Sequence, residues 1–187
     1  VDGQGAICSA MDIAFDVAGL ARPDRHAVRR IVGLSLPHAV RGLAPDADDE
    51  THALIVDAYK SAYRAARADG SLAEPLFDGI VPLLDGLLAD GWQLGIATGK
   101  SHRGLTHCLA NHGLSQHFVT LQTADFHPSK PHPAMLEAAL AEAFADPADA
   151  VMIGDTAYDM VMAVNAGVRA IGVDWGYHEP AELLAAG

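Results

Sequence analysis

Three short polar segments in the second half of the sequence each follow an apolar run. The first is Thr98-Gly99-Lys100-Ser101, which follows the apolar stretch 93–97. A strand that ends in a hydroxyl residue and a glycine, and then enters a helix, presents backbone N–H groups that can bind an anion. Thr98, Gly99 and Lys100 are therefore candidate phosphate-binding residues. The same pattern also occurs in ordinary strand-to-helix turns, so it is not specific by itself.

The second segment places a lysine in a proline-rich loop, Ser129-Lys130-Pro131-His132-Pro133. Proline stiffens the backbone, and a fixed backbone turns a flexible ammonium group into a positioned charge. Lys130 is therefore a candidate phosphate-binding and catalytic residue. The simpler interpretation is a solvated loop lysine.

The third segment carries two carboxylates, Asp155 and Asp159, in Gly154-Asp-Thr-Ala-Tyr-Asp159 after a short apolar run. Mg²⁺ prefers oxygen ligands and binds through one or two carboxylates while it keeps several waters. Asp155 could instead cap the helix that follows. A cap explains one aspartate and not both, so the pattern favours a metal site made by Asp155 and Asp159.

Strands and helices alternate from about residue 78 onward. This pattern predicts a parallel α/β sheet, in which the three polar segments lie at the carboxyl ends of strands, where such sheets bind ligands. The expected strands are 93–98, 118–123, 150–153 and 170–173. The expected helices are 101–112, 133–144 and 158–166, the last ending at Gly167.

The first part of the sequence shows only helical patterns. Helices are expected over 6–20, from the cap Asp24 through residue 31, and over 48–68, with a Gly/Pro-punctuated connection at 33–45 that holds a short helix. A helical block ahead of α/β units indicates a small helical domain beside an α/β core, joined near 69–70 and 78–79.

The composition excludes several classes of partner. The formal net charge of -12 with only 12 Lys and Arg argues against nucleic acid, whose backbone requires a basic surface. No apolar run reaches the about 18 residues of a membrane span, and no signal peptide is visible. The two cysteines predict reduced thiols in a cytoplasmic protein. The ten histidines lack metal-ligand spacing, so none is assigned as a ligand.

The three segments together resemble motifs II, III and IV of the haloacid dehalogenase-like (HAD) superfamily: TGK, SKPHP and GDTxxD stand in that order on successive strand ends. The helical block resembles the cap of the phosphoglycolate phosphatase-like branch. The resemblance implies a Rossmann-like parallel sheet core at 78–187 with an inserted helical cap at 6–77. Residues 1–5 would be the tail of motif I and the linker to the cap.

The resemblance also implies a role for each candidate residue. Thr98 would hydrogen-bond the transferring phosphoryl group, Lys130 would offset its charge, and Asp155 would bind Mg²⁺ with help from Asp159. The nucleophilic and acid/base aspartates of motif I are expected upstream of Val1, on a core strand that is missing from the chain and would lie between strands 93–98 and 150–153. The expected function is that of a Mg²⁺-dependent phosphatase acting on a small phosphorylated metabolite, phosphoglycolate-like, through an aspartyl-phosphate, as a monomer or homodimer.

Other functions of the same core stay open at this stage. A haloacid dehalogenase needs no metal, and the paired aspartates count against it. A phosphosugar mutase uses the same core, and a non-catalytic phosphate-binding protein could have kept the anion site without a nucleophile. The stretch 33–45 is the expected substrate-contact region of the cap, with Arg41 a weak candidate that equally suits a solvated surface residue.

Overall fold

A computed structural model describes all 187 residues, and the chain divides into two compact units. Unit 1 comprises residues 1–32 and 36–77, and unit 2 comprises residues 33–35 and 78–187. The tripeptide 33–35 thus packs with unit 2, although its neighbours in the sequence on both sides belong to unit 1.

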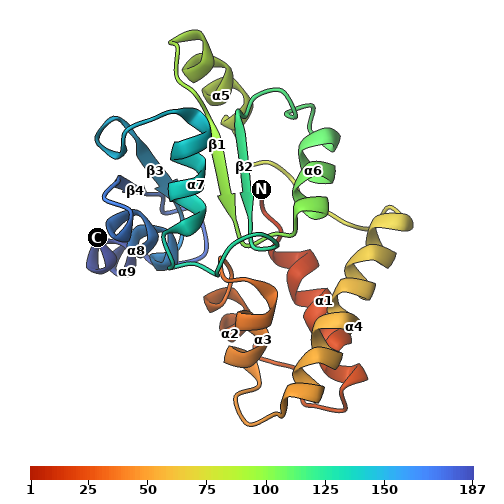
Figure 1. Cartoon of the computed structure of the whole chain (residues 1–187). Coiled ribbons are helices and arrows are strands. Elements are labelled where there is room, and N and C mark those ends of the chain that lie inside the picture. Colours follow the sequence, from red (N-terminus) through yellow and green to blue (C-terminus); the bar gives the residue numbers. More distant parts are fainter. The chain divides into compact units, whose positions relative to one another are not determined.

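Unit 1 consists of helices and contains no strand, as predicted (Figure 1). Aspartate side chains cap two of the helices, and the cap at Asp24 was predicted. The Asp24 carboxylate accepts hydrogen bonds from the backbone N–H groups of His26 and Ala27, and the Asp48 carboxylate accepts one from Thr51. The helices are α1 (Gln4–Val17), α2 (Arg25–Arg30), α3 (Leu36–Leu43) and α4 (Asp49–Ala68).

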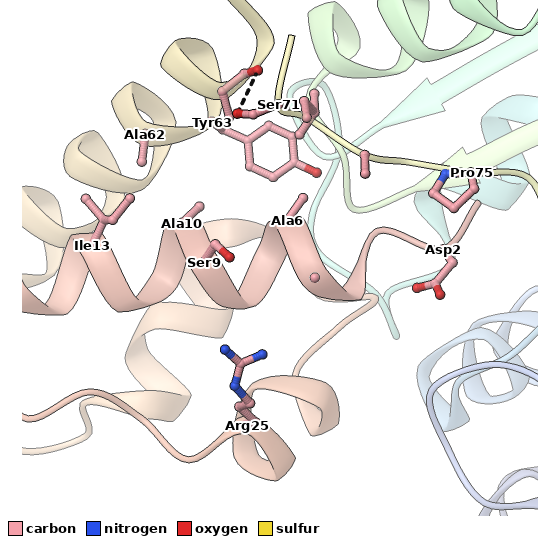
Figure 2. Close-up of a pocket in the computed structure, with 14 residues that line it drawn as sticks. Asp2, Ala6, Ser9, Ala10, Ile13, Arg25, Ala62, Tyr63, Ser71 and Pro75 are labelled. Carbon is pink, nitrogen blue, oxygen red and sulfur yellow. Dashed lines mark hydrogen bonds between the residues drawn. The ribbon is translucent and has the colours of Figure 1, made fainter. Parts of the chain in front are cut away.

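The core of unit 1 forms where α1 packs along α4. Its buried side chains come from all four helices and include Cys8, Met11, Phe15, Val28, Val40 and Ile55. A separate cavity of about 550 Å³ lies in this unit, with alanines of α1 and α4 on its walls and Arg25 and Tyr63 among its polar side chains (Figure 2). All of its lining residues fall between Asp2 and Pro75, so none of the predicted site residues reaches it.

Unit 2 alternates strands and helices, and all four predicted strands are confirmed, with shifts of one or two residues at their bounds. Ser101 caps α6 and Gly167 ends α8 at a φ of 69°, as expected. The elements are α5 (Ile80–Ala89), β1 (Gly95–Thr98), α6 (His102–Asn111), β2 (Thr120–Thr123), α7 (Ala134–Ala143), the 3-10 turn η1 (Pro147–Asp149), β3 (Val151–Gly154), α8 (Ala157–Asn165), β4 (Arg169–Gly172) and α9 (Pro180–Ala186).

The strands form two parallel pairs in separate sheets, β1 with β2 and β3 with β4. Thr98 stands opposite Thr123, so the carboxyl ends of β1 and β2 coincide. Helix α7 packs against β1 and β2, and α8 packs against β3 and β4 (Figure 1). One apolar cluster joins both halves, because Met135 of α7 and Met162 of α8 belong to it and Ala97 of β1 and Met152 of β3 pack against it.

Strands β1 and β3 share this apolar layer but exchange no backbone hydrogen bonds. Direct pairing, which would exclude a strand between them, is absent. Ile153 of β3 and Ile171 of β4 are each 51% exposed, whereas apolar strands of a parallel sheet are normally covered on both faces. Strands β3 and β4 therefore have exposed apolar surface, and β1 and β3 each have an unpaired edge with which another strand could form hydrogen bonds.

The cysteines, Cys8 and Cys108, are both free and buried. The length and apolar character that a bilayer-crossing helix requires are not found together in any helix.

Candidate active site

Lys130 and Asp159 form a buried ion pair in unit 2. Lys130 lies in the loop between β2 and α7, Asp159 lies in the first turn of α8, and Lys130 Nζ is 2.6 Å from Asp159 Oδ1. Both side chains are about nineteen-twentieths buried, with relative exposures of 6% and 5%. Buried charges of this kind persist in proteins when they are paired and hydrogen-bonded. The lysine is therefore a positioned charge and not a solvated loop residue.

Asp159 also closes the cap of α8. Thr156 is the N-cap residue, and its hydroxyl accepts the N–H of Asp159 while the Asp159 carboxylate accepts the N–H and O–H of Thr156. The helix is therefore capped by Thr156 and not by Asp155. Burial would raise the pKa of Asp159, but the Lys130 charge and the hydrogen bonds from Lys130 and Thr156 outweigh it and lower that pKa.

Asp155 has a contrasting environment. It follows β3, is half-buried, and accepts one hydrogen bond at Oδ2 from the backbone N–H of Tyr177, at 3.1 Å. Burial, followed by the nearby charge of Asp159, raises the pKa of Asp155, and the Tyr177 amide and Lys130 only partly oppose this. Asp155 is thus a carboxylate whose negative charge the protein does not fully compensate.

The Thr98 segment lies at the carboxyl end of β1, as predicted. The Thr98 hydroxyl oxygen accepts the backbone N–H of Lys100 at 3.2 Å. Because a hydroxyl can donate while it accepts, the Thr98 proton stays available for an acceptor such as a phosphate oxygen. Ser101 caps the following helix by accepting the N–H of Gly104, so its side chain serves the helix.

The tripeptide 33–35 links the three predicted segments. The Ser35 N–H donates to Ser129 Oγ at 2.8 Å, beside Lys130. A Cβ built on Gly99 would lie only 2.5 Å from the carbonyl oxygen of Leu34, and one built on Gly33 would lie 3.0 Å from Thr156 Oγ1. The loops after β1, β2 and β3 therefore converge on one short piece of chain, which brings together the segments that carry Thr98, Lys130 and Asp155.

Some of the contacts around the site could not be predicted from the sequence pattern. The stretch 33–45 was expected to contact the substrate, and its first three residues do lie against the site segments. Arg41 instead lies in α3, where its guanidinium is 3.7 Å from the exposed carboxylate of Asp49. The roles of Ser129 and Thr156 were not predicted, because isolated hydroxyl residues in loops are too common to stand out.

The oxygen ligands at this site suit Mg²⁺ better than a metal ion whose ligands all come from protein side chains. The structure contains no group of three or more His, Cys, Asp or Glu side chains placed to hold a metal. Asp159 is committed to Lys130 and Thr156, which leaves Asp155 as the carboxylate with spare negative charge. Mg²⁺ often binds through one or two carboxylates and completes its shell with water and substrate phosphate.

These features define an α/β protein with a buried, paired lysine and an acidic turn in the loops that follow its strands. The family model for haloacid dehalogenase-like hydrolases matches residues 1–173, and the chain belongs to that family. Curated phosphoglycolate phosphatases are among its relatives, which places it in the phosphoglycolate phosphatase-like branch. The protein is therefore a hydrolase of the phosphatase type.

Individual relatives are longer than this chain. Probable phosphatase IndB of Dickeya dadantii is 36% identical over 192 residues, which cover 100% of this chain and 81% of IndB. Tyrosine-protein kinase PtkA of Mycobacterium tuberculosis is 31% identical over 179 residues, or 94% of this chain and 59% of PtkA. A crystal structure of a predicted phosphatase from Clostridium acetobutylicum superposes with a TM-score of 0.87 at 25% identity, covering 100% of this chain and 85% of that one.

Proposed function

We propose that the protein is a Mg²⁺-dependent phosphatase that hydrolyses a small phosphorylated metabolite through an aspartyl-phosphate. The observation that carries this proposal is the buried Lys130–Asp159 pair beside the incompletely compensated carboxylate of Asp155. A fixed ammonium group and an acidic cation ligand in neighbouring loops after the strands are suited to a phosphoryl group, whose oxygens need positive charge around them.

Each residue contributes to charge or orientation. Lys130 offsets negative charge on the phosphoryl oxygens, and Asp159 holds its ammonium in place. The Thr98 hydroxyl and the Gly99 N–H bind phosphoryl oxygens, and the Lys100 N–H, which donates to the Thr98 hydroxyl oxygen, orients that hydroxyl. Asp155 holds Mg²⁺, which when bound supplies further positive charge to those oxygens.

The chemical step requires an aspartate nucleophile. We infer that it stands on a strand that fills the space between β1 and β3, where both strands have unpaired edges. Its carboxylate oxygen attacks phosphorus, the bond from phosphorus to the ester oxygen breaks, and a second aspartate protonates the leaving alcohol. Water, deprotonated by that second aspartate, then cleaves the aspartyl-phosphate and releases inorganic phosphate.

Unit 1 is proposed to act as the cap, with boundaries near residues 6 and 77. Its role would be to exclude bulk water and select the substrate. The resemblance to phosphoglycolate phosphatases favours a small, anionic phosphate ester as the substrate.

Activity of the full-length protein tests this proposal. Para-nitrophenyl phosphate and phosphoglycolate should release phosphate with Mg²⁺ and not with a chelator present. Chelator-resistant release of halide from a 2-haloacid would instead identify a dehalogenase, and isomerisation of a sugar phosphate without net phosphate release would identify a mutase. Phosphate binding without turnover in any of these assays would identify a non-catalytic binding protein.

A further inference from the structure

The segment Gly176-Tyr177-His178 lies between β4 and α9 and wraps around the turn that carries Asp155. β3 and β4 pair in parallel with Gly154 opposite Gly172, so the chain leaving β4 runs beside the chain leaving β3. The Tyr177 N–H donates to Asp155 Oδ2, and the His178 N–H donates to the Asp155 carbonyl oxygen, each at 3.1 Å. Both the side chain and the backbone of Asp155 are thus bound by this one segment.

His178 makes a third contact, to the start of α8. The Ala157 N–H donates to His178 Nδ1 at 3.1 Å. Because this nitrogen accepts a hydrogen bond, the ring N–H is the one at Nε2. The ring is only 3% exposed, and the Tyr158 ring packs against it edge-on with centroids 5.3 Å apart. The imidazole is therefore fixed in position and in tautomer.

This contact alters what the first turn of α8 can bind. Free N–H groups at a helix N-terminus attract anions. Here the Ala157 N–H is taken by His178 and the Asp159 N–H by Thr156. A phosphate therefore finds these two donors occupied, and the turn presents the Asp155 carboxylate instead.

Gly176 supplies the close approach that the arrangement needs. A Cβ at this position would lie 2.1 Å from Asp155 Cβ and 2.3 Å from its Oδ2. Gly176 does not have a positive φ, so the requirement for glycine here is steric and not conformational. Any side chain at residue 176 must displace Asp155 or the segment itself.

We propose that Gly176 and His178 are positioning residues that hold the Asp155 carboxylate in its cation-binding orientation before the cation arrives. This inference rests on the proposed function, in which Asp155 is a Mg²⁺ ligand. Outer contacts of this kind orient a ligand that would otherwise lose side-chain entropy on binding, and their removal typically weakens metal binding by about 10–100-fold.

Substitutions of His178 can separate positioning from simple folding. His178→Asn keeps an acceptor, Oδ1, at the same number of bonds from Cα as Nδ1, and should retain the contact with the Ala157 N–H. His178→Gln moves its acceptor one bond further out and should not. Gly176→Ala tests the steric part, and Asp48→Ala, which removes a helix cap in unit 1, is the control for a general loss of a helix-terminal contact.

The readout is Mn²⁺ binding to the full-length protein without substrate, measured by electron paramagnetic resonance and accompanied by thermal unfolding. His178→Gln and Gly176→Ala should weaken binding by about tenfold or more, while His178→Asn and Asp48→Ala stay within about threefold of wild type. Wild-type affinity in both His178→Gln and Gly176→Ala would overturn the inference, as would equal losses in His178→Asn and His178→Gln. If Asp155→Asn binds Mn²⁺ as wild type does, the proposed function fails instead.

Discussion

The Lys130 ammonium and the Asp159 carboxylate meet 2.6 Å apart in the interior of unit 2. The pair ties the loop after β2 to the first turn of α8, two segments 29 residues apart in the sequence. It therefore serves the fold and the site together, because the same contact that fixes the lysine also locks the cap of the helix behind Asp155.

Breaking this pair should destabilise the protein strongly. Asp159→Asn keeps the shape of the side chain but leaves the buried lysine uncompensated, which typically costs about 3–5 kcal/mol. Urea unfolding of the full-length protein measures the change. Asp16→Asn is the matched control, because Asp16 pairs with Arg22 at the exposed surface, and its unfolding midpoint should stay near that of wild type. Equal midpoints for the two variants would contradict the assignment.

Asp155 should behave in the opposite way from Asp159 in metal-free buffer. Its pKa is raised above the ordinary 3.8, so the charged form is disfavoured in the folded state and lowers stability at neutral pH. Asp155→Asn should therefore raise the unfolding temperature at pH 7 with a chelator present. The advantage should shrink as the pH falls through the raised pKa, because wild-type Asp155 then becomes neutral. A lower unfolding temperature for the variant at pH 7 would show that the carboxylate is better compensated than its contacts indicate.

Gly99 should be intolerant of even one methyl group. Its Cβ would lie 2.5 Å from the Leu34 carbonyl oxygen and 2.8 Å from that of Gly33, both backbone atoms that cannot rotate away. Gly99→Ala should displace the tripeptide 33–35 or the turn formed by residues 98–101, and should lower kcat/KM by about 100-fold.

Gly86→Ala provides the control for Gly99→Ala. Gly86 lies inside α5 with nothing within 4 Å of a built Cβ, so alanine should stabilise the helix by about 0.5–1 kcal/mol and leave kcat/KM unchanged. Steady-state kinetics measures kcat/KM of both variants, and urea unfolding measures their free energies of unfolding. Normal kcat/KM in Gly99→Ala would mean that the tripeptide is not fixed against the site.

The unpaired edges of β1 and β3 predict a difference in amide exchange. If a further strand fills the space between them in the full-length protein, backbone amides of 95–98 and 151–154 should exchange more slowly there than in a protein limited to residues 1–187. Without such a strand, each buried backbone N–H or C=O group that lacks a hydrogen-bond partner would cost about 1–3 kcal/mol of folding free energy. Hydrogen–deuterium exchange with mass spectrometry compares the two proteins. If the amides of β1 and β3 exchange at the same rate in the two proteins, no strand lies between them.

The sequence predicted most elements because their signals are local. Asp24 and Ser101 were predicted at helix starts as caps, and each accepts backbone N–H groups of the helix that follows. Helix α5 was not predicted, because Pro82 and Gly86 interrupt its apolar pattern. Pro82 is accommodated because it lies in the first turn, where a proline removes no intrahelical hydrogen bond.

The candidate site was predictable only as far as its motifs extend. Lys130 and Asp155 stood out because each follows an apolar run, but the direct contact between Lys130 and Asp159 depends on how the loop and α8 pack. The roles of Gly176 and His178 depend on the pairing of β3 with β4, and the role of Gly33 depends on a segment from between α2 and α3 joining unit 2. Such contacts arise from tertiary structure and leave no periodic trace in the sequence.

The most direct test of the account is the Mg²⁺-dependent hydrolysis of para-nitrophenyl phosphate by full-length wild-type protein, Lys130→Ala and Asp155→Asn. Lys130→Ala removes a positive charge beside the phosphoryl group, and Asp155→Asn removes the carboxylate proposed to hold Mg²⁺, so kcat should fall by about 100-fold or more in both. Circular dichroism should show folded protein, which separates loss of chemistry from loss of structure. Wild-type kcat in either folded variant would contradict the assignment of this site as a phosphatase active site.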